Sequence, residues 1–200
     1  MEYDVALSFA GEDREYVEKV AEILHAVGLK VFYDRYEEVD MWGKNLYTHL
    51  DDVYRKKSRY CVMFASKYYK EKLWTNHERQ SAQARAFNQS EEYILPIKID
   101  ETEIPGLLPT TGYIKAEHRK PEELAILIAK KVNPKIDIEL MLSYLYSELP
   151  DYKISIIGTN VVFECQDEDY HGEFPLRLLL EMYRLNLLDE MFLLPGIVPS

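Results

Sequence analysis

The stretch YCVMFA at Tyr60–Ala65 decides the fold, because its unbroken run of apolar side chains leaves no face for water. Such a run is typical of a strand that is buried on both faces of a parallel sheet. The runs Tyr3–Phe9, Lys30–Tyr33 and Tyr93–Ile99 are also short and rich in strand-forming residues. Helical patterns separate these runs. The sequence therefore predicts an α/β domain with a parallel sheet.

Glycine and proline mark the ends of the predicted helices. Gly28 follows an apolar helical pattern at the usual C-terminal position, and Pro121 lies at a favoured first-turn position. A long helix is predicted over roughly residues 66–88, and Tyr113–Lys115 is expected to be a short edge strand. Five short strands favour the flavodoxin-like order 2-1-3-4-5. In such sheets ligands bind at the carboxyl ends of strands one and three, where the strand order reverses.

The sequence Asn133-Pro134-Lys135 separates two regions. We expect one domain over residues 1–133 and a small α+β extension over residues 136–200. In the extension the pattern predicts a helix near residues 136–148, two strands at Lys153–Ile157 and Asn160–Cys165, and a helix near residues 175–186. The role of this extension is open between packing against the first domain and docking of a partner protein.

Composition limits the partners that the chain can have. The formal net charge of −11 disfavours nucleic acid and anionic membranes, since both require a positive surface. No apolar run approaches the roughly 20 residues that span a bilayer, and the first residues are acidic where a signal peptide would be basic. Cys61 and Cys165 are unclustered, which predicts reduced core residues rather than a disulfide or a metal site. We expect a cytoplasmic protein that needs no metal.

Two tryptophans stand out as candidates for binding. Trp74 and Glu78 are four residues apart, so on a helix they share a face that would overlook the predicted crevice. The simpler interpretation is a half-buried aromatic residue and a solvated glutamate. Trp42 lies in a charged loop, where its ring either packs into the core or docks on a ligand. No glycine-rich phosphate loop and no nucleophile elbow are present.

With these residues assembled, the region Glu2–Val132 resembles a bacterial TIR (Toll/interleukin-1 receptor) domain. Four ordered blocks carry the resemblance: YDVALSFAGED at 3–13, GLKVFYDRYEEVDMWGKNL at 28–46, YCVMFASKYYKEKLWTNHE at 60–78 and ILPIKID at 94–100. The resemblance implies a flavodoxin-like TIR domain with a five-stranded parallel sheet. The second block contains the BB loop of that family.

The resemblance also implies an activity. Many bacterial TIR domains cleave NAD⁺ between nicotinamide and ribose, giving ADP-ribose or a cyclic isomer in anti-phage immunity. NAD⁺ is then the substrate and no further cofactor is needed. Glu78 is expected to be the catalytic residue, and Trp74 to stack on nicotinamide or adenine. The other residues expected to bind substrate are Ser8, Phe9 and Ala10 on one wall, and Asp34, Trp42, Gly43 and Lys44 in the BB loop.

Other members of the family are non-catalytic scaffolds that pair one TIR domain with another, which is the alternative function. In the enzymes a neighbouring protomer's BB loop completes the active site, so the resemblance implies a homo-oligomer. An activator or partner protein is expected to dock on the extension. This chain departs from the enzymes at Ala10-Gly11-Glu12, where they often carry a basic residue. How the phosphates are held, and whether hydrolysis or cyclisation follows cleavage, stay open.

Overall fold

Five parallel strands form the first sheet of the chain. The computed structural model describes residues 1–33, 56–73, 94–103, 112–165 and 171–189. The strands are β1 (Tyr3–Ser8), β2 (Val31–Phe32), β3 (Ser58–Ala65), β4 (Ile94–Lys98) and β5 (Ile114–Lys115). Their order is β2-β1-β3-β4-β5, and every neighbouring pair is parallel. The predicted order and the short edge strand are confirmed.

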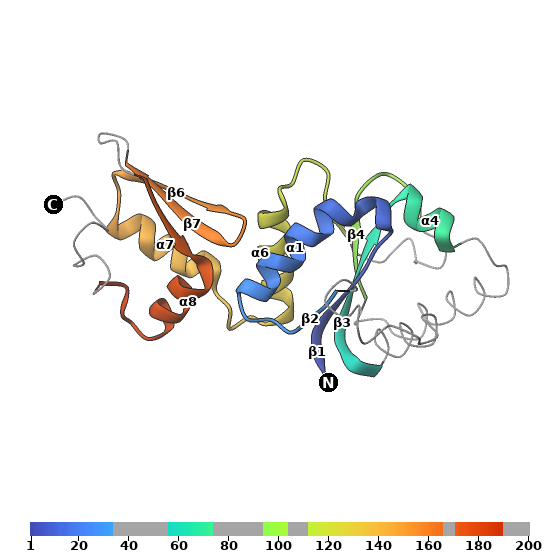
Figure 1. Cartoon of the computed structure of the whole chain (residues 1–200), viewed down its shortest axis with the longest axis horizontal. Coiled ribbons are helices and arrows are strands. Elements are labelled where there is room, and N and C mark those ends of the chain that lie inside the picture. Colours follow the sequence, from blue (N-terminus) through green and yellow to red (C-terminus); the bar gives the residue numbers. More distant parts are fainter. Residues whose placement is uncertain (34–55, 74–93, 104–111, 166–170, 190–200) are drawn as a thin grey trace.

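The helices described in this region connect the strands. They are the 3-10 turn η1 (Gly11–Asp13), α1 (Arg14–Ala26), α4 (Lys67–Leu73) and α6 (Pro121–Val132). Figure 1 shows α1 and α6 side by side on the same side of the sheet. The helix α1 ends where Gly28 takes a φ of +91°, which lets the Gly28 and Leu29 N–H groups bond back to the last turn. Gly28 and Pro121 therefore act as predicted.

The strand β3 is the centre of the core. Its residues from Cys61 to Ala65 are all buried, as the apolar run predicts. On one side it pairs with β1, whose residues Val5, Ala6 and Leu7 are also buried, and on the other with β4. Burial raises the pKa of the Cys61 thiol to about 12, so this cysteine stays protonated and unreactive. The buried position of Cys61 confirms its prediction as a core residue.

The extension is a three-stranded antiparallel sheet with two helices. Its elements are α7 (Ile138–Glu148), β6 (Tyr152–Ile157), β7 (Asn160–Cys165), β8 (His171–Pro175) and α8 (Leu176–Arg184), with strand order β6-β7-β8. The prediction of a two-stranded hairpin missed β8. That strand contains Gly172 and Pro175, which disfavour a strand locally, and it forms because it pairs with β7.

Two side-chain hydrogen bonds hold the sheet of the extension, one at the edge strand β6 and one at the β6–β7 turn. The Tyr146 hydroxyl donates to the Ile154 carbonyl of β6 at 2.5 Å, so it covers part of that edge of the sheet. The Glu122 carboxylate of α6 accepts from the Gly158 N–H at 3.0 Å, which attaches the β6–β7 turn to the first sheet's helix layer. Figure 1 shows the extension on the side of α1 and α6 that faces away from the sheet.

The apolar core is continuous from the first sheet to the extension. Val132, Ile136 and Ile138 are buried in a cluster that contains residues of both. The division at residues 133–136 remains a prediction. Within the residues that the structure describes, no helix is long and apolar enough to cross a membrane.

Ser58 provides a test of the core. Its side chain is 2% exposed, and its hydroxyl has no hydrogen-bond partner among the described residues. A buried hydroxyl without a partner costs desolvation energy, so Ser58→Ala is expected to leave the free energy of unfolding unchanged or raise it by about 1–2 kcal/mol. Urea denaturation of the two proteins measures this difference.

Ser66→Ala is the matched control, because Ser66 is equally buried but donates to the Asp13 carboxylate at 2.6 Å. Loss of a hydrogen bond to a charged group is expected to lower the free energy of unfolding by roughly 1.5–3 kcal/mol. A comparable loss in Ser58→Ala would contradict the assignment of Ser58 as unpartnered.

Candidate functional site

The strand order places the topological switch point of the sheet between the carboxyl ends of β1 and β3. These strands are neighbours although β2 comes between them along the chain, so their connections leave in opposite directions. Ser8 is the last residue of β1 and Ser66 directly follows β3. Side chains of the two segments therefore meet at the point where ligands bind in such sheets.

A pair of hydroxyl groups joins the end of β1 to α4 at this switch point. The Ser8 Oγ lies 2.7 Å from the Tyr69 Oη of α4, and either atom can donate the hydrogen. Ser8 is only 8% exposed, while Tyr69 is half-buried. A phenol is a weak base, so this pair is suited to hold a hydrogen-bonding ligand rather than to activate Ser8 as a nucleophile.

A second hydrogen bond joins the same two segments. The Ser66 hydroxyl donates to Asp13 Oδ2 at 2.6 Å and accepts from the Tyr69 N–H at 3.1 Å. The second contact is that of an N-capping serine, which satisfies a backbone donor in the first turn of α4. Ser66 thus fixes the start of α4 to the loop that follows β1.

An aromatic pair and a guanidinium lie beside β1. The rings of Phe9 and Tyr33 are stacked, with centroids 5.5 Å apart and an interplanar angle of 15°. The guanidinium carbon of Arg14 lies 5.2 Å from the Phe9 centroid, and Nη1 donates to the Tyr33 hydroxyl at 3.3 Å. Cation–π attraction and the hydrogen bond place a positive charge in the first turn of α1.

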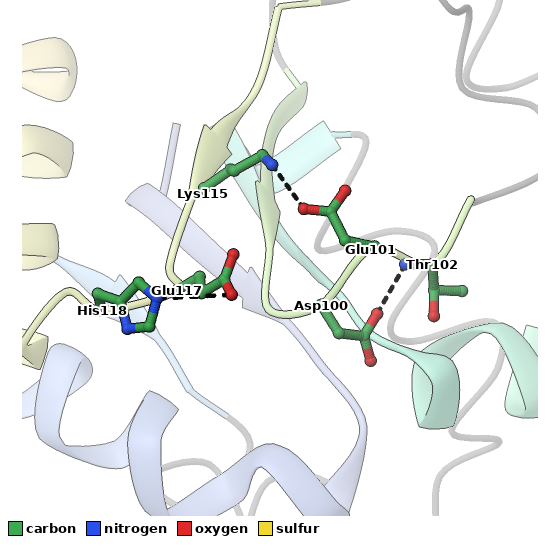
Figure 2. A network of polar contacts seen from close by, with 6 residues as sticks. All are labelled: Asp100, Glu101, Thr102, Lys115, Glu117 and His118. Atoms are coloured by element: carbon green, nitrogen blue, oxygen red, sulfur yellow. Dashed lines mark hydrogen bonds and ion pairs between the residues drawn. The ribbon is translucent and has the colours of Figure 1, made fainter.

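The carboxyl end of β4 supports the same edge (Figure 2). Asp100 Oδ2 accepts from the Lys67 N–H of α4, and Asp100 Oδ1 accepts from the Thr102 N–H, both at 2.9 Å. Figure 2 also shows the Lys115 ammonium directed at the Glu101 carboxylate, at 2.5 Å. The start of α4 is therefore held by Asp100, which follows β4, as well as by the loop after β1.

These contacts account for part of the predicted site. Ser8, Phe9 and Ala10 lie at the carboxyl end of β1, and Ala10 is fully buried with its carbonyl accepting from the Asp13 N–H. The other predicted residues lie outside the described residues: Asp34, Trp42, Gly43, Lys44, Trp74 and Glu78. The roles assigned to all nine residues remain predictions.

The contacts made by Asp13, Arg14, Tyr69 and Asp100 were missed by the analysis of the sequence. The spacing of Ser66 and Tyr69 is that of an N-cap and its third helical residue, which is a signal that sequence analysis can use. Arg14 also bears on the departure at Ala10-Gly11-Glu12, because it places a basic group beside Phe9 a few residues later.

A separate apolar hollow of about 400 Å³ lies along β4, β5 and α6. Its lining includes Pro96, Tyr113 and Leu127, with Lys131 as the charged residue, and contains no residue of β1 or β3. This hollow is therefore separate from the switch point between β1 and β3.

Comparison with known proteins identifies relatives of the first region. The sequence profile of the TIR domain family matches residues 5–128. The chain is 63% identical over 131 residues to the 3′ cyclic ADP-D-ribose synthase AaTIR of Aquimarina amphilecti, covering 66% of this chain and 40% of that protein. It is 35% identical over 111 residues to the 2′ cyclic ADP-D-ribose synthase AbTIR of Acinetobacter baumannii, covering 54% of this chain and 40% of that protein.

A third relative is named as a hydrolase. The chain is 36% identical over 97 residues to the NAD(+) hydrolase TcpA of a Theionarchaea archaeon, covering 48% of this chain and 28% of that protein. The chain thus matches less than half the length of each of these curated relatives.

Ionisation of Asp100 makes the folding stability of this edge of the sheet depend on pH. Burial opposes ionisation of Asp100, but hydrogen bonds from Thr102 and from the Lys67 N–H outweigh it and lower the pKa of the carboxyl below its ordinary value. A lowered folded-state pKa adds stability above the ordinary aspartate pKa, and this stability is lost as pH falls through the folded value. We expect Asp100→Asn to be less stable than the wild type at pH 7, with the gap closing at acid pH.

Urea denaturation of both proteins from pH 7 down to the acid range measures that gap. Asp151→Asn is the control for the change in net charge, since Asp151 is exposed on the extension. A gap between wild type and Asp100→Asn that stays constant over the whole range would contradict the role of the charged carboxylate.

Proposed function

This chain belongs to the TIR domain family, and we propose that it cleaves NAD⁺ between nicotinamide and ribose. The observation that carries the proposal is the 63% identity over 131 residues to a 3′ cyclic ADP-D-ribose synthase. The family profile covers residues 5–128, which include Ser8, Trp74 and Glu78. We further propose that the main product is a cyclic ADP-ribose, with linear ADP-ribose as the product of competing hydrolysis. A role in anti-phage immunity stays a prediction.

The reaction needs little proton transfer in its first step. The bond between C1′ of the ribose and N1 of the pyridinium breaks, and its electron pair neutralises the positive nitrogen. Nicotinamide therefore leaves as a neutral molecule without a general acid, unlike the leaving oxygen of an ordinary glycoside. The enzyme has to hold the ribose and stabilise the positive charge that develops on it. One well-placed carboxylate meets the second requirement.

Glu78 is the residue proposed for that role. By the family resemblance it belongs to the W-x-x-x-E motif with Trp74, and both follow α4 in the sequence. The start of α4 is held by Ser66 and Asp100 at the switch point. These contacts support the proposal, because they fix the segment that leads directly to Trp74 at the edge where such sheets bind ligands.

The second step decides the product. Attack by water on the ribose carbon gives ADP-ribose and a proton, whereas attack by a hydroxyl elsewhere in the same ADP-ribose closes a ring and releases the same proton. Exclusion of water and a folded substrate favour ring closure. The synthase names of two of the relatives favour this outcome for the chain.

The first test is nicotinamide release by the purified full chain at high protein concentration. We expect Glu78→Gln to lower the rate by about 10²–10³-fold, since it removes the charge that stabilises the transition state. Glu71→Gln, an exposed glutamate on α4, is the matched control and is expected to retain the wild-type rate. Chromatography of the products separates cyclic from linear ADP-ribose.

Wild-type protein that releases no nicotinamide, even when it is artificially clustered, would contradict the proposal. The result would favour the alternative of a non-catalytic scaffold that pairs TIR domains.

Self-association gives a second test. If a neighbouring protomer completes the site, specific activity is expected to rise with protein concentration in parallel with the fraction of oligomer. Light scattering and nicotinamide release on the same dilution series measure the two quantities. Constant specific activity in a sample that stays monomeric would show that one chain contains the complete site.

The extension is proposed to take part in assembly or in docking of an activator. Its sheet and helices lie beside the α1 and α6 layer, so a partner bound there would also be close to that layer.

A further inference from the structure

We propose that Tyr69 is a positioning residue for NAD⁺, which acts by orienting the hydroxyl of Ser8 toward the substrate ribose. This inference rests on the proposed function. Its structural basis is the 2.7 Å contact between Ser8 Oγ at the end of β1 and Tyr69 Oη of α4.

The position of the Tyr69 ring is fixed from its own backbone. Its N–H donates to Ser66 Oγ at 3.1 Å, and the same Ser66 hydroxyl donates to Asp13 at 2.6 Å. The backbone of Tyr69 is therefore held by the capping serine, and its hydroxyl by Ser8. A side chain on a fixed backbone with a bonded tip loses little further freedom when a ligand binds, which is the condition for preorganisation.

The hydrogen-bond inventory of the two hydroxyls explains how Tyr69 acts. A serine hydroxyl carries one donor and two acceptor lone pairs. A phenol is the stronger donor of the two, so the favoured arrangement has Tyr69 donating to Ser8. The proton of Ser8 is then directed away from Tyr69 and can be donated to an oxygen of the ribose. Without Tyr69 the Ser8 hydroxyl rotates among several orientations.

The burial of Ser8 strengthens this effect. At 8% exposure, its hydroxyl has little access to water that would replace the missing partner. A neutral hydrogen bond that is lost in such a place is worth about 0.5–1.5 kcal/mol, which corresponds to a change of about two- to tenfold in affinity.

The test compares Tyr69→Phe, Ser8→Ala and the double variant in steady-state nicotinamide release by the full chain. Tyr69→Phe keeps the ring and removes only the hydroxyl. We expect it to raise the KM for NAD⁺ by about two- to tenfold with a smaller effect on kcat. Because Tyr69 acts through Ser8, the double variant is expected to have the same KM as Ser8→Ala alone.

Tyr68→Phe is the matched control, since Tyr68 is the adjacent residue of α4, is 37% exposed and lies under the Lys67 ammonium rather than at Ser8. It is expected to leave KM unchanged. Thermal unfolding of each variant separates a loss of stability from a loss of substrate positioning, because a merely structural role of Tyr69 would lower Tm and leave KM unchanged.

Two results would overturn the inference. An unchanged KM in Tyr69→Phe, or a double variant whose loss is the product of the two single losses, would show that Tyr69 does not act through Ser8. If the wild type cleaves NAD⁺ and Glu78→Gln cleaves it far more slowly, either result would contradict the role of Tyr69 and leave the proposed function intact. A wild type that does not cleave NAD⁺ would overturn the proposed function and this inference together.

Discussion

The parallel pairing of β1 with β3 is the constraint on which the rest of the structure depends. Their register brings Ser8, the last residue of β1, opposite Met63, and β3 continues for two more residues to Ala65. The apolar residues of the two strands are buried on both faces of the sheet, so core packing holds the pair together. The position of the switch point thus follows from core packing, whereas its chemistry follows from the residues just past the strands.

The loop after β1 and the start of α4 are joined by polar contacts. Ser8 with Tyr69 and Asp13 with Ser66 link the β1 loop to the start of α4, and Asp100 adds a contact from β4. The residues that stabilise the first turn of α4 therefore lie at the same edge as Ser8. Polar contacts hold this edge, while the centres of β3 and α1 are buried apolar residues.

The end of α1 at Gly28 and the start of α6 at Pro121 were predictable, because backbone chemistry is a local property of the sequence. The strand order was predictable because five strands alternating with helices favour one common arrangement. The strand β8 was not, since Gly172 and Pro175 oppose a strand until β7 is present to pair with it. Ser8 and Ala10 were placed correctly at the end of β1. The partner of Ser8 could not be predicted, because Tyr69 reaches it through a contact between residues 61 positions apart.

The hydrogen bond from Tyr146 to the Ile154 carbonyl has a consequence for crowded conditions. An uncovered edge strand invites pairing with any other extended chain, which leads to uncontrolled growth of sheets. The Tyr146 hydroxyl occupies an acceptor that an added strand would need, so docking a strand at β6 requires this bond to break first. Molecules of this chain can therefore be brought close together through helices and loops, with less risk that their extension sheets fuse along β6.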